Sequence, residues 1–293
     1  MRILLTGKNG QVGFELQKKL NALGQVISIS RNELDLVNPQ AIRNFVDLTH
    51  PDIIINPAAY TAVDKAEKEV NLAHQINVVA PEVFAQKAKE LNIPLIHFST
   101  DYVFDGLKKD PYVETDKANP QSIYGKTKYE GEEKVRLHQK HIILRTSWVF
   151  GVNGNNFLKA ILRLIEDKES LDVVGDQYGS PSSASMLAEV TYKIVDDIFK
   201  NKNFNNYGTY HVTNEGETNW SQYAILIASE AIKLGLKVKC NPDHIHSILT
   251  SDYSAVAKRP LNSRLNTDKL KKTFMLELQS WELEVKKVLR EIA

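Results

Sequence analysis

A tyrosine and a lysine lie four residues apart in the stretch "SIYGKTKYEGEEK", which reads as the start of an amphipathic helix. Side chains at positions i and i+4 share one helical face, so Tyr124 and Lys128 are expected to lie side by side. A free phenol titrates near ~10, and a neighbouring ammonium stabilises the phenolate and lowers that pKa. The pair could therefore donate a proton at neutral pH, although Tyr-x-x-x-Lys is also common by chance on solvated helices.

Three glycines near the amino end form a second candidate site. Gly7, Gly10 and Gly13 give the pattern G-x-x-G-x-x-G between the apolar run "RILLT" (2–6) and the first amphipathic helix. Glycine permits a tight turn and lets the main chain approach a pyrophosphate, which then rests on the helix N-terminus. The pattern predicts a dinucleotide site, and a tight strand-to-helix turn without a ligand is the alternative.

The elements around these motifs alternate regularly. Strands are expected at 2–6, 26–30, 52–59, 94–100 and 141–151. Helices are expected from Pro39, with Asn38 as the N-cap, over 64–92 with an interruption at Pro81, and from Tyr124. Alternation of this kind predicts an α/β fold with a doubly wound parallel sheet of the Rossmann type. Residues 1–150 are expected to form the dinucleotide-binding domain.

The pattern beyond residue 151 is looser and predicts a second, smaller α/β region laid over the first. Helices are expected near 155–167, 183–200 and 219–235, and strands at 171–174 and 208–214. Residues 151–293 are therefore expected to form mainly a substrate-binding domain, with parts of 182–214 returning to the first domain.

The fourth expected strand ends in "HFSTDYVFDG", at the carboxyl edge of the sheet, where doubly wound folds bind ligands. Ser99 and Thr100 would place a hydroxyl beside a nicotinamide, and Tyr124 begins the next helix. A Ser/Thr–Tyr–Lys set of this kind performs carbonyl reduction. In this set, Lys128 would lower the pKa of Tyr124 and hold the cofactor ribose. Thr100 would hydrogen-bond the substrate oxygen as negative charge develops on that oxygen.

The end of the second expected strand bears on the choice of cofactor. An acidic residue there usually binds the adenosine ribose of NAD, but this chain has Ser30 and Arg31. A hydroxyl and a cation suit a 2′-phosphate, so NADPH is favoured or at least accepted; a solvated surface role for Arg31 is the alternative. Asp35 and Leu36 could border the adenine.

Composition excludes several other classes. The chain has 293 residues, of which 42% are apolar and 25% are charged, an ordinary globular composition. Its formal net charge is only +1, so the protein as a whole has no strong electrostatic attraction to nucleic acid or to an anionic membrane. No apolar run approaches the ~18 residues of a membrane span, and the opening "MRILLTGKNG" is no signal peptide. We expect a cytoplasmic protein whose single cysteine, Cys240, is a small buried or incidental residue rather than a nucleophile.

Over nearly its whole length the chain resembles the extended short-chain dehydrogenases/reductases, and among them the dTDP-4-dehydrorhamnose reductases. The resemblance lies in the order and spacing of eight segments, "TGKNGQVGFEL", "NPAAYTAVDKAE", "STDYVFDG", "YGKTKYEGE", "LRTSWVFG", "NNFLKAIL", "DQYGSPSSA" and "KRPLNSRLNTDKL". It implies a nucleotide-sugar substrate domain and reduction of the C4 keto group of dTDP-4-dehydro-β-L-rhamnose by NADPH or NADH.

The resemblance also implies roles for particular residues. On the cofactor side, Gly10, Gln11 and Val12 would contact the pyrophosphate, and Ala58, Ala59 and Tyr60 would line the nicotinamide ribose. On the substrate side, Thr100 and Asp101 would contact the sugar, Trp148 would stack on it, and Arg259 would bind the dTDP diphosphate. Tyr124 would be the proton donor, with Lys128 as its partner. From the residues alone, Trp148 would be a core aromatic and Arg259 a surface charge.

The chain departs from the family pattern at Pro57, where a small residue is expected, and at Ser182, where threonine is usual. Some members dimerise through magnesium bound by surface glutamates, and Glu15, Glu189 and Glu291 lie at plausible positions. Because glutamates on helices are mostly solvated, no metal site is predicted, and a homodimer stays open.

Two other functions are compatible with the sequence. One is a nucleotide-sugar 4-epimerase or dehydratase of the same superfamily, which recycles a tightly held NAD. The other is a non-catalytic dinucleotide-binding subunit, similar to the regulatory subunit of methionine adenosyltransferase. The set of Thr100, Tyr124 and Lys128 argues against the second, because a binding subunit needs no proton donor.

Overall fold

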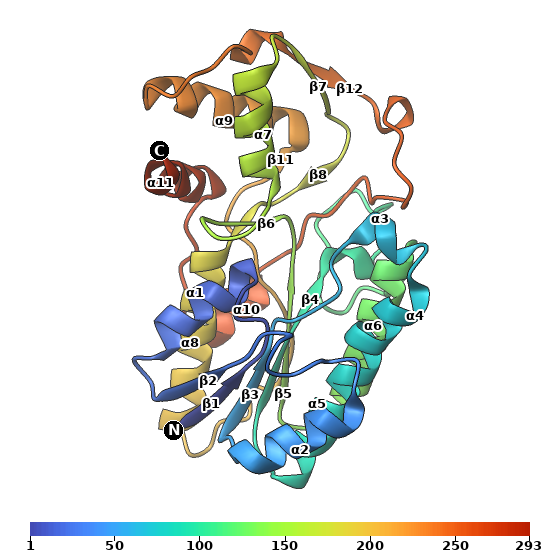
Figure 1. Cartoon of the computed structure of the whole chain (residues 1–293), viewed down its shortest axis with the longest axis vertical. Coiled ribbons are helices and arrows are strands. Elements are labelled where there is room, and N and C mark those ends of the chain that lie inside the picture. Colours follow the sequence, from blue (N-terminus) through green and yellow to red (C-terminus); the bar gives the residue numbers. More distant parts are fainter.

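A computed structural model describes all residues, 1–293, and shows a six-stranded sheet with helices on both faces (Figure 1). The strand order is β10-β5-β4-β3-β1-β2, and every neighbouring pair is parallel, so all six carboxyl ends lie along one edge. The strands are β1 (Arg2–Leu5), β2 (Gln25–Ser28), β3 (Ile53–Asn56), β4 (Leu95–Thr100), β5 (His141–Thr146) and β10 (Gly208–His211). The predicted α/β fold with a parallel sheet is confirmed.

The sheet is buried on both faces, as parallel strands require. Ile3 and Leu5 of β1 point into one core with the helices α1, α8 and α10, while Leu4 points into another with α2 and α5. Figure 1 shows these two helical layers on opposite sides of the sheet. Their bounds are α1 (Gln11–Leu20), α8 (Ala184–Lys200) and α10 (Asp268–Phe274) on one side, and α2 (Pro39–Thr49), α5 (Ala80–Glu90) and α6 (Ile123–Arg136) on the other.

The helical stretch expected over 64–92 is several pieces. It consists of α3 (Val63–Ala66), α4 (Val70–His74), a π-helical turn at Gln75–Val79 and α5. Pro81 lies in the first turn of α5, where its missing N–H is tolerated, so the proline itself breaks nothing. The irregularity precedes it, at the π-turn that contains Asn77.

The strand expected at 141–151 is also interrupted. β5 ends at Thr146, and the chain resumes as β6 (Val149–Phe150), which pairs with β9 (Ser182–Ser183) instead of with the main sheet. Between them Trp148 adopts a left-handed backbone conformation with φ of 49°. Ser147 holds this turn, because its hydroxyl donates to the Ser180 carbonyl at 2.8 Å.

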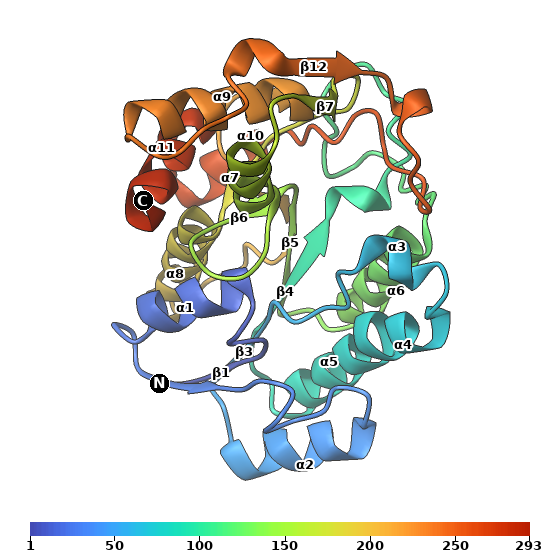
Figure 2. The same cartoon turned by 45° about the horizontal axis from the view of Figure 1, so that its top comes forward.

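The rest of the second half forms a smaller α/β region around an apolar core of its own. Figure 2 shows it on the side of the sheet toward which β4 points. Its elements are α7 (Phe157–Asp167), α9 (Trp220–Lys233), α11 (Trp281–Ile292), the pair β7 (Leu171–Val174) and β12 (Ile245–Ile248), and the pair β8 (Tyr178–Gly179) and β11 (Thr218–Asn219). Short 3₁₀ turns lie at Asp101–Val103, Pro242–His244 and Thr250–Asp252.

Two elements between residues 182 and 214, α8 and β10, lie with the first sheet, where α8 packs on α1 and β10 pairs with β5. The division of the chain into two domains stays a prediction. Cys240 is fully buried and free, as expected. None of the helices is both long enough and apolar enough to span a membrane.

Candidate active site

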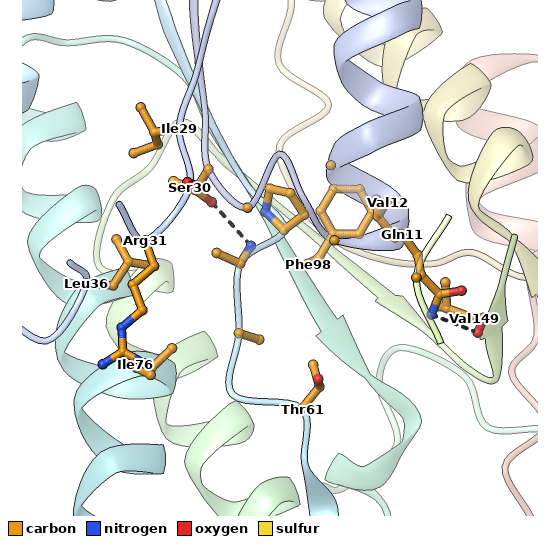
Figure 3. A pocket seen from close by; sticks show the side chains of 18 of the residues that line it. Gln11, Val12, Ile29, Ser30, Arg31, Leu36, Thr61, Ile76, Phe98 and Val149 are labelled. Atoms are coloured by element: carbon orange, nitrogen blue, oxygen red, sulfur yellow. Dashed lines mark hydrogen bonds between the residues drawn. The ribbon is translucent and has the colours of Figure 1, made fainter. Parts of the chain in front are cut away.

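A cavity of about 520 Å³ lies at the carboxyl ends of the strands (Figure 3). Figure 3 shows Ser30, Arg31 and Leu36 at one end and Gln11 with Val149 at the other. Most of the predicted cofactor residues line the cavity, namely Gly7, Gly10, Gln11, Val12, Gly13, Ser30, Arg31, Asp35, Leu36, Ala58, Ala59, Tyr124 and Lys128. Tyr60, Thr100, Asp101, Trp148 and Arg259 are not among the lining residues.

The glycine loop has a geometry that other residues would disturb. Gly7 has φ of 65°, a left-handed conformation, and a Cβ at Gly13 would lie 2.1 Å from the Gly7 carbonyl oxygen. Helix α1 begins at Gln11, and its N-cap residue Gly10 has no side chain to cap it. The first N–H groups of α1 therefore lack a side-chain cap, and this terminus can hold a pyrophosphate.

One buried hydroxyl in the cavity also fits a bound ligand. The Oγ1 of Thr146, at the end of β5, is buried, lines the cavity and has no hydrogen-bond partner in the protein. Since buried polar atoms are normally paired, this hydroxyl suits a polar group of a ligand. Together with the glycine loop, it shows that the residues present fit a dinucleotide.

The opposite end of the cavity is formed by the loop after β2. Ser30 donates its backbone N–H and its hydroxyl to the carboxylate of Glu33, at 2.8 and 2.6 Å. Arg31 lies 3.9 Å from Asp35, and its side chain is 74% exposed. The predicted role of Ser30 and Arg31 toward a 2′-phosphate stays a prediction.

Helix α6 carries the proposed proton donor and its partner. Its N-cap Ser122 accepts the N–H of Gly125 at 3.1 Å, and this fixes the first turn, in which Tyr124 lies. Lys128 is 2% exposed; its Nζ donates to the Phe98 carbonyl at 2.6 Å and lies 3.3 Å from His97 Nε2. Burial lowers the pKa of Lys128 to about 8, and the nearby Glu132 carboxylate opposes this.

The pKa of Tyr124 moves in the direction opposite to the one expected. Burial raises it to about 12, while a hydrogen bond with Thr100 lowers it and the charge of Asp101 raises it. The expectation that Lys128 lowers the pKa of Tyr124 is wrong for this structure, because the Lys128 ammonium is directed at the Phe98 carbonyl. Tyr124 thus holds its proton firmly.

Asp101, directly after β4, is an unusual buried carboxyl group. It is 3% exposed, its Oδ1 accepts the Thr100 hydroxyl at 3.0 Å, and its Oδ2 has no hydrogen-bond partner. Burial raises its pKa to about 6, against smaller opposing effects of neighbouring hydrogen bonds. Thr100 and Asp101 are therefore directly linked, beside the Tyr124 hydroxyl.

The other predicted substrate residues, Trp148 and Arg259, and the predicted cofactor residue Tyr60 are not among the residues that line the cavity. Trp148 stacks on Trp220, with ring centroids 3.6 Å apart and planes 15° apart. Arg259 pairs with Asp64 at 3.2 Å, and its Nε is buried with no hydrogen-bond partner. The hydroxyl of Tyr60 donates to Glu69 at 2.6 Å. The roles given to these residues by resemblance stay predictions.

Several buried polar residues support the site and were missed from the sequence. Thr6 donates to Asn56 Oδ1 at 2.6 Å, and the Asn56 amide lies 3.1 Å from His97 Nδ1. The chain of contacts ends at Lys128, and burial keeps the pKa of His97 well below its usual value. No local sequence signal marks these residues, because the partners come from the end of β1, from β3, from β4 and from helix α6.

Asn77 was also missed. Its Oδ1 accepts the N–H of Tyr60 at 2.8 Å, and its Nδ2 donates to the Thr127 hydroxyl at 3.1 Å. It thereby joins the segment after β3 to helix α6.

The glutamates considered for magnesium are not gathered into a site. Glu15 pairs with Lys18 at 3.2 Å, and Glu189 pairs with Lys19. No group of three or more His, Cys, Asp or Glu side chains is arranged to hold a metal ion.

Comparison with known proteins places the chain in a family. The family model described as the RmlD substrate binding domain matches residues 1–293. dTDP-4-dehydrorhamnose reductases from Shigella flexneri and Escherichia coli K12 are each 42% identical over 297 residues, covering 100% of this chain and 98% of theirs.

Solved structures agree. A dTDP-4-dehydrorhamnose reductase from Clostridium acetobutylicum superposes with a TM-score of 0.91 at 38% identity, covering 100% of this chain and 99% of that one. The Bacillus anthracis reductase, solved in complex with NADP, has a TM-score of 0.90 at 36% identity, with 99% of each chain covered. From the family model and these full-length relatives, the chain belongs to the RmlD family, that of the dTDP-4-dehydrorhamnose reductases.

Proposed function

We propose that this protein reduces the C4 keto group of dTDP-4-dehydro-β-L-rhamnose to give dTDP-β-L-rhamnose. The observation that carries the proposal is the joint placement of Tyr124 and Lys128 in the cavity that the glycine loop opens into. Relatives with this name align over the full chain, and one of them was solved with NADP.

The nicotinamide cofactor, when bound, supplies a hydride to C4. Tyr124 then gives its phenolic proton to the oxygen that becomes the 4-hydroxyl, so the carbonyl gains one hydride and one proton. A pKa of about 12 keeps this proton on Tyr124 until the substrate oxygen becomes an alkoxide, which is more basic than a phenolate. Proton loss is thus driven by the reaction itself.

The neighbouring residues orient the reaction. In this proposal the Thr100 hydroxyl, which is within hydrogen-bond reach of Tyr124, turns from Asp101 to contact the substrate oxygen; its links to both residues support the role. The Lys128 ammonium, which donates to a backbone carbonyl, has further N–H donors for the cofactor ribose and for the phenolate that Tyr124 becomes. Positioning and charge complementarity are what these residues contribute.

A 4-epimerase or dehydratase remains the nearest alternative activity. The UDP-glucose 4-epimerase of Thermotoga maritima has a TM-score of 0.80 but only 18% identity, which supports a shared fold alone. An epimerase retains its cofactor, whereas a reductase must release it oxidised in every cycle.

The deciding experiment follows cofactor oxidation at 340 nm with dTDP-4-dehydrorhamnose and, in parallel, other dTDP-keto sugars and UDP-glucose. We expect stoichiometric oxidation of NADPH or NADH with dTDP-4-dehydrorhamnose and no change in absorbance with UDP-glucose. Sugar conversion without net cofactor oxidation would instead identify an epimerase. Binding of dinucleotide with no conversion of any sugar would identify a non-catalytic subunit.

A further inference from the structure

The loop after β2 holds an internal carboxylate, Glu33, which is bound to the cavity-lining residue Ser30 and does not line the cavity itself. Glu33 Oε2 accepts both the N–H of Ser30, at 2.8 Å, and its hydroxyl, at 2.6 Å. Its other oxygen, Oε1, accepts from Lys8 Nζ at 2.6 Å. Lys8 belongs to the glycine loop, so one carboxylate ties the two loops together.

These three donors are a typical set for holding a phosphate. A backbone N–H, a serine hydroxyl and a lysine ammonium converging on two oxygens form charge-assisted hydrogen bonds to any small anion. Glu33 remains an anion across the physiological range, because Lys8 and Ser30 lower its pKa to about 2. Its side chain is 44% exposed, so it can swing into solvent without disturbing a core.

The charged side chains of these two loops already balance one another. Lys8 and Arg31 are balanced by Glu33 and Asp35, two cations against two anions in these loops. A cofactor with a 2′-phosphate brings about two further negative charges to Ser30. That phosphate and the Glu33 carboxylate cannot share the same donors, because like charges at hydrogen-bond distance repel.

We propose that Glu33 determines cofactor specificity by competing with the 2′-phosphate of NADPH for Ser30 and Lys8. With NADH the carboxylate keeps all three contacts. With NADPH it must leave them, and the phosphate then binds Ser30 and Lys8. Glu33 thus lowers the preference for NADPH that Ser30 and Arg31 would otherwise confer, and the protein uses both cofactors. The inference rests on the dinucleotide site of the proposed function.

Binding of cofactor fragments tests this without any turnover. Calorimetric titration of the full chain with adenosine 2′,5′-bisphosphate and with 5′-AMP separates the 2′-phosphate from the rest of the nucleotide. We expect Glu33→Ala and Glu33→Gln to tighten binding of the bisphosphate by about tenfold, equivalent to about 1.4 kcal/mol, and to leave 5′-AMP within about twofold.

Two further variants serve as controls. Glu90→Ala removes an exposed glutamate that pairs with a lysine, Lys87, but lies outside the cavity, so the bisphosphate affinity should stay within about twofold of wild type. Lys8→Met removes a shared donor, so it should weaken bisphosphate binding several-fold, the reverse of Glu33→Ala. Unchanged or weaker bisphosphate binding in both Glu33 variants would overturn the inference.

Titration with NADPH and NADH by nicotinamide fluorescence extends the test to whole cofactors. The ratio of their dissociation constants should shift toward NADPH in both Glu33 variants. This readout also separates the two proposals. If the ratio shifts while no dTDP-sugar is reduced, the proposed function fails and the specificity role of Glu33 stands. If wild type reduces the sugar and the ratio of dissociation constants does not change in the Glu33 variants, the proposed function stands and the specificity role of Glu33 fails.

Discussion

Tyr124 combines two properties that a reductase needs at one atom. Its phenol lines the cavity, and burial raises its pKa to about 12, so it is protonated when substrate arrives. A catalytic acid whose pKa lies far above the working pH gives up its proton only to a strong base. The alkoxide formed at C4 is such a base, whereas bulk water is not.

Replacing Tyr124 by phenylalanine should therefore abolish proton donation and leave the cavity shape nearly intact. We expect kcat to fall by about 10³-fold, within the range that general acid catalysis contributes. The dissociation constant of NADPH, measured by fluorescence, should stay within a few-fold of wild type. Turnover close to that of wild type would exclude Tyr124 as the donor.

The ammonium of Lys128 makes the reaction sensitive to alkali. Its pKa is lowered to about 8 by burial, so the cationic form prevails below this pH and is lost above it. We predict that kcat/KM is level below about pH 7.5 and falls about tenfold per pH unit above 8.5, since this parameter reports groups of the free enzyme. A profile that stays flat to pH 10 would contradict a role for the ammonium.

Asp101 should lower stability at neutral pH. Its folded-state pKa of about 6 lies above the ordinary value of 3.8, so the folded protein retains a proton that the unfolded chain loses between these values. Stability from this group is thus full below about pH 4 and declines as pH rises to 6. Asp101→Asn should raise the free energy of unfolding at pH 7 by about 1–3 kcal/mol.

Urea unfolding of Asp101→Asn and wild type at pH 4 and pH 7 measures this difference. The two proteins should differ less at pH 4, where Asp101 is protonated in the folded protein and partly protonated in the unfolded chain. Equal stability at pH 7 would show that the buried carboxylate is solvated or paired more fully than the unpartnered Oδ2 indicates. Activity should also fall in the variant, since the resemblance to the family implies that Asp101 contacts the sugar.

At the scale of helices and turns, the sequence predicted the features that depend on residues close together in the chain. Asn38 caps α2, with its side chain accepting the Ala41 N–H and Pro39 in the first turn, as expected from the sequence. The spacing of Tyr124 and Lys128 on one helix and of the three glycines in one turn could be predicted for the same reason. Each depends on residues within a few positions of one another.

The π-turn at Gln75–Val79 depends on partners that are distant in sequence. Asn77 is held by Tyr60 and Thr127, and a Cβ at Gly131 of α6 would lie 2.0 Å from the Asn77 carbonyl oxygen. The break after β5 and the contacts of His97 likewise depend on residues that are distant in sequence. Periodicity within a single window carries no information about such pairs.

Gly131 tests how closely α6 must approach the π-turn. In an open helix Gly→Ala stabilises by up to about 1 kcal/mol, but here the added methyl overlaps a backbone oxygen. We predict that Gly131→Ala lowers the free energy of unfolding by about 1–3 kcal/mol and reduces kcat, since α6 carries Tyr124 and Lys128. Thermal unfolding and steady-state kinetics measure both effects.

The matched control is Lys126→Ala on the exposed face of the same helix. It should change stability by less than about 0.5 kcal/mol and leave kcat unaltered. If Gly131→Ala behaves like this control, α6 can move away from Asn77 without consequence for the site.

At the scale of the whole molecule, the two regions contact each other around the cavity. The Gln11 amide, from the glycine loop, donates to the Val149 carbonyl at 3.4 Å, and Asn156 donates to Gln11 Oε1 at 2.9 Å. Such contacts, 138 and 145 residues apart in sequence, could not be predicted from residue patterns. Among these residues, the resemblance to a family gave a role to Gln11 alone, and the structure shows its partners Val149 and Asn156.

Asp64 makes another connection between segments that are distant in sequence. Its Oδ1 accepts the N–H of Ala257 at 3.0 Å, and its Oδ2 pairs with Arg259 at 3.2 Å, so one carboxylate positions the segment that carries the proposed diphosphate ligand. Both side chains are partly exposed, so the pair contributes at most about 1 kcal/mol to stability. Its main effect should be on substrate binding.

Asp64→Ala should raise the KM for the dTDP-sugar by about 5- to 10-fold through loss of the Arg259 position, with kcat and NADPH affinity close to wild type. Arg259→Ala should raise the same KM further. If Asp64 acts only through Arg259, the double variant will match Arg259→Ala, because effects of coupled residues do not add. Additive increases in KM would show instead that Asp64 contacts the substrate independently of Arg259. An unchanged KM in Asp64→Ala would show that the Asp64–Arg259 pair has no role in substrate binding.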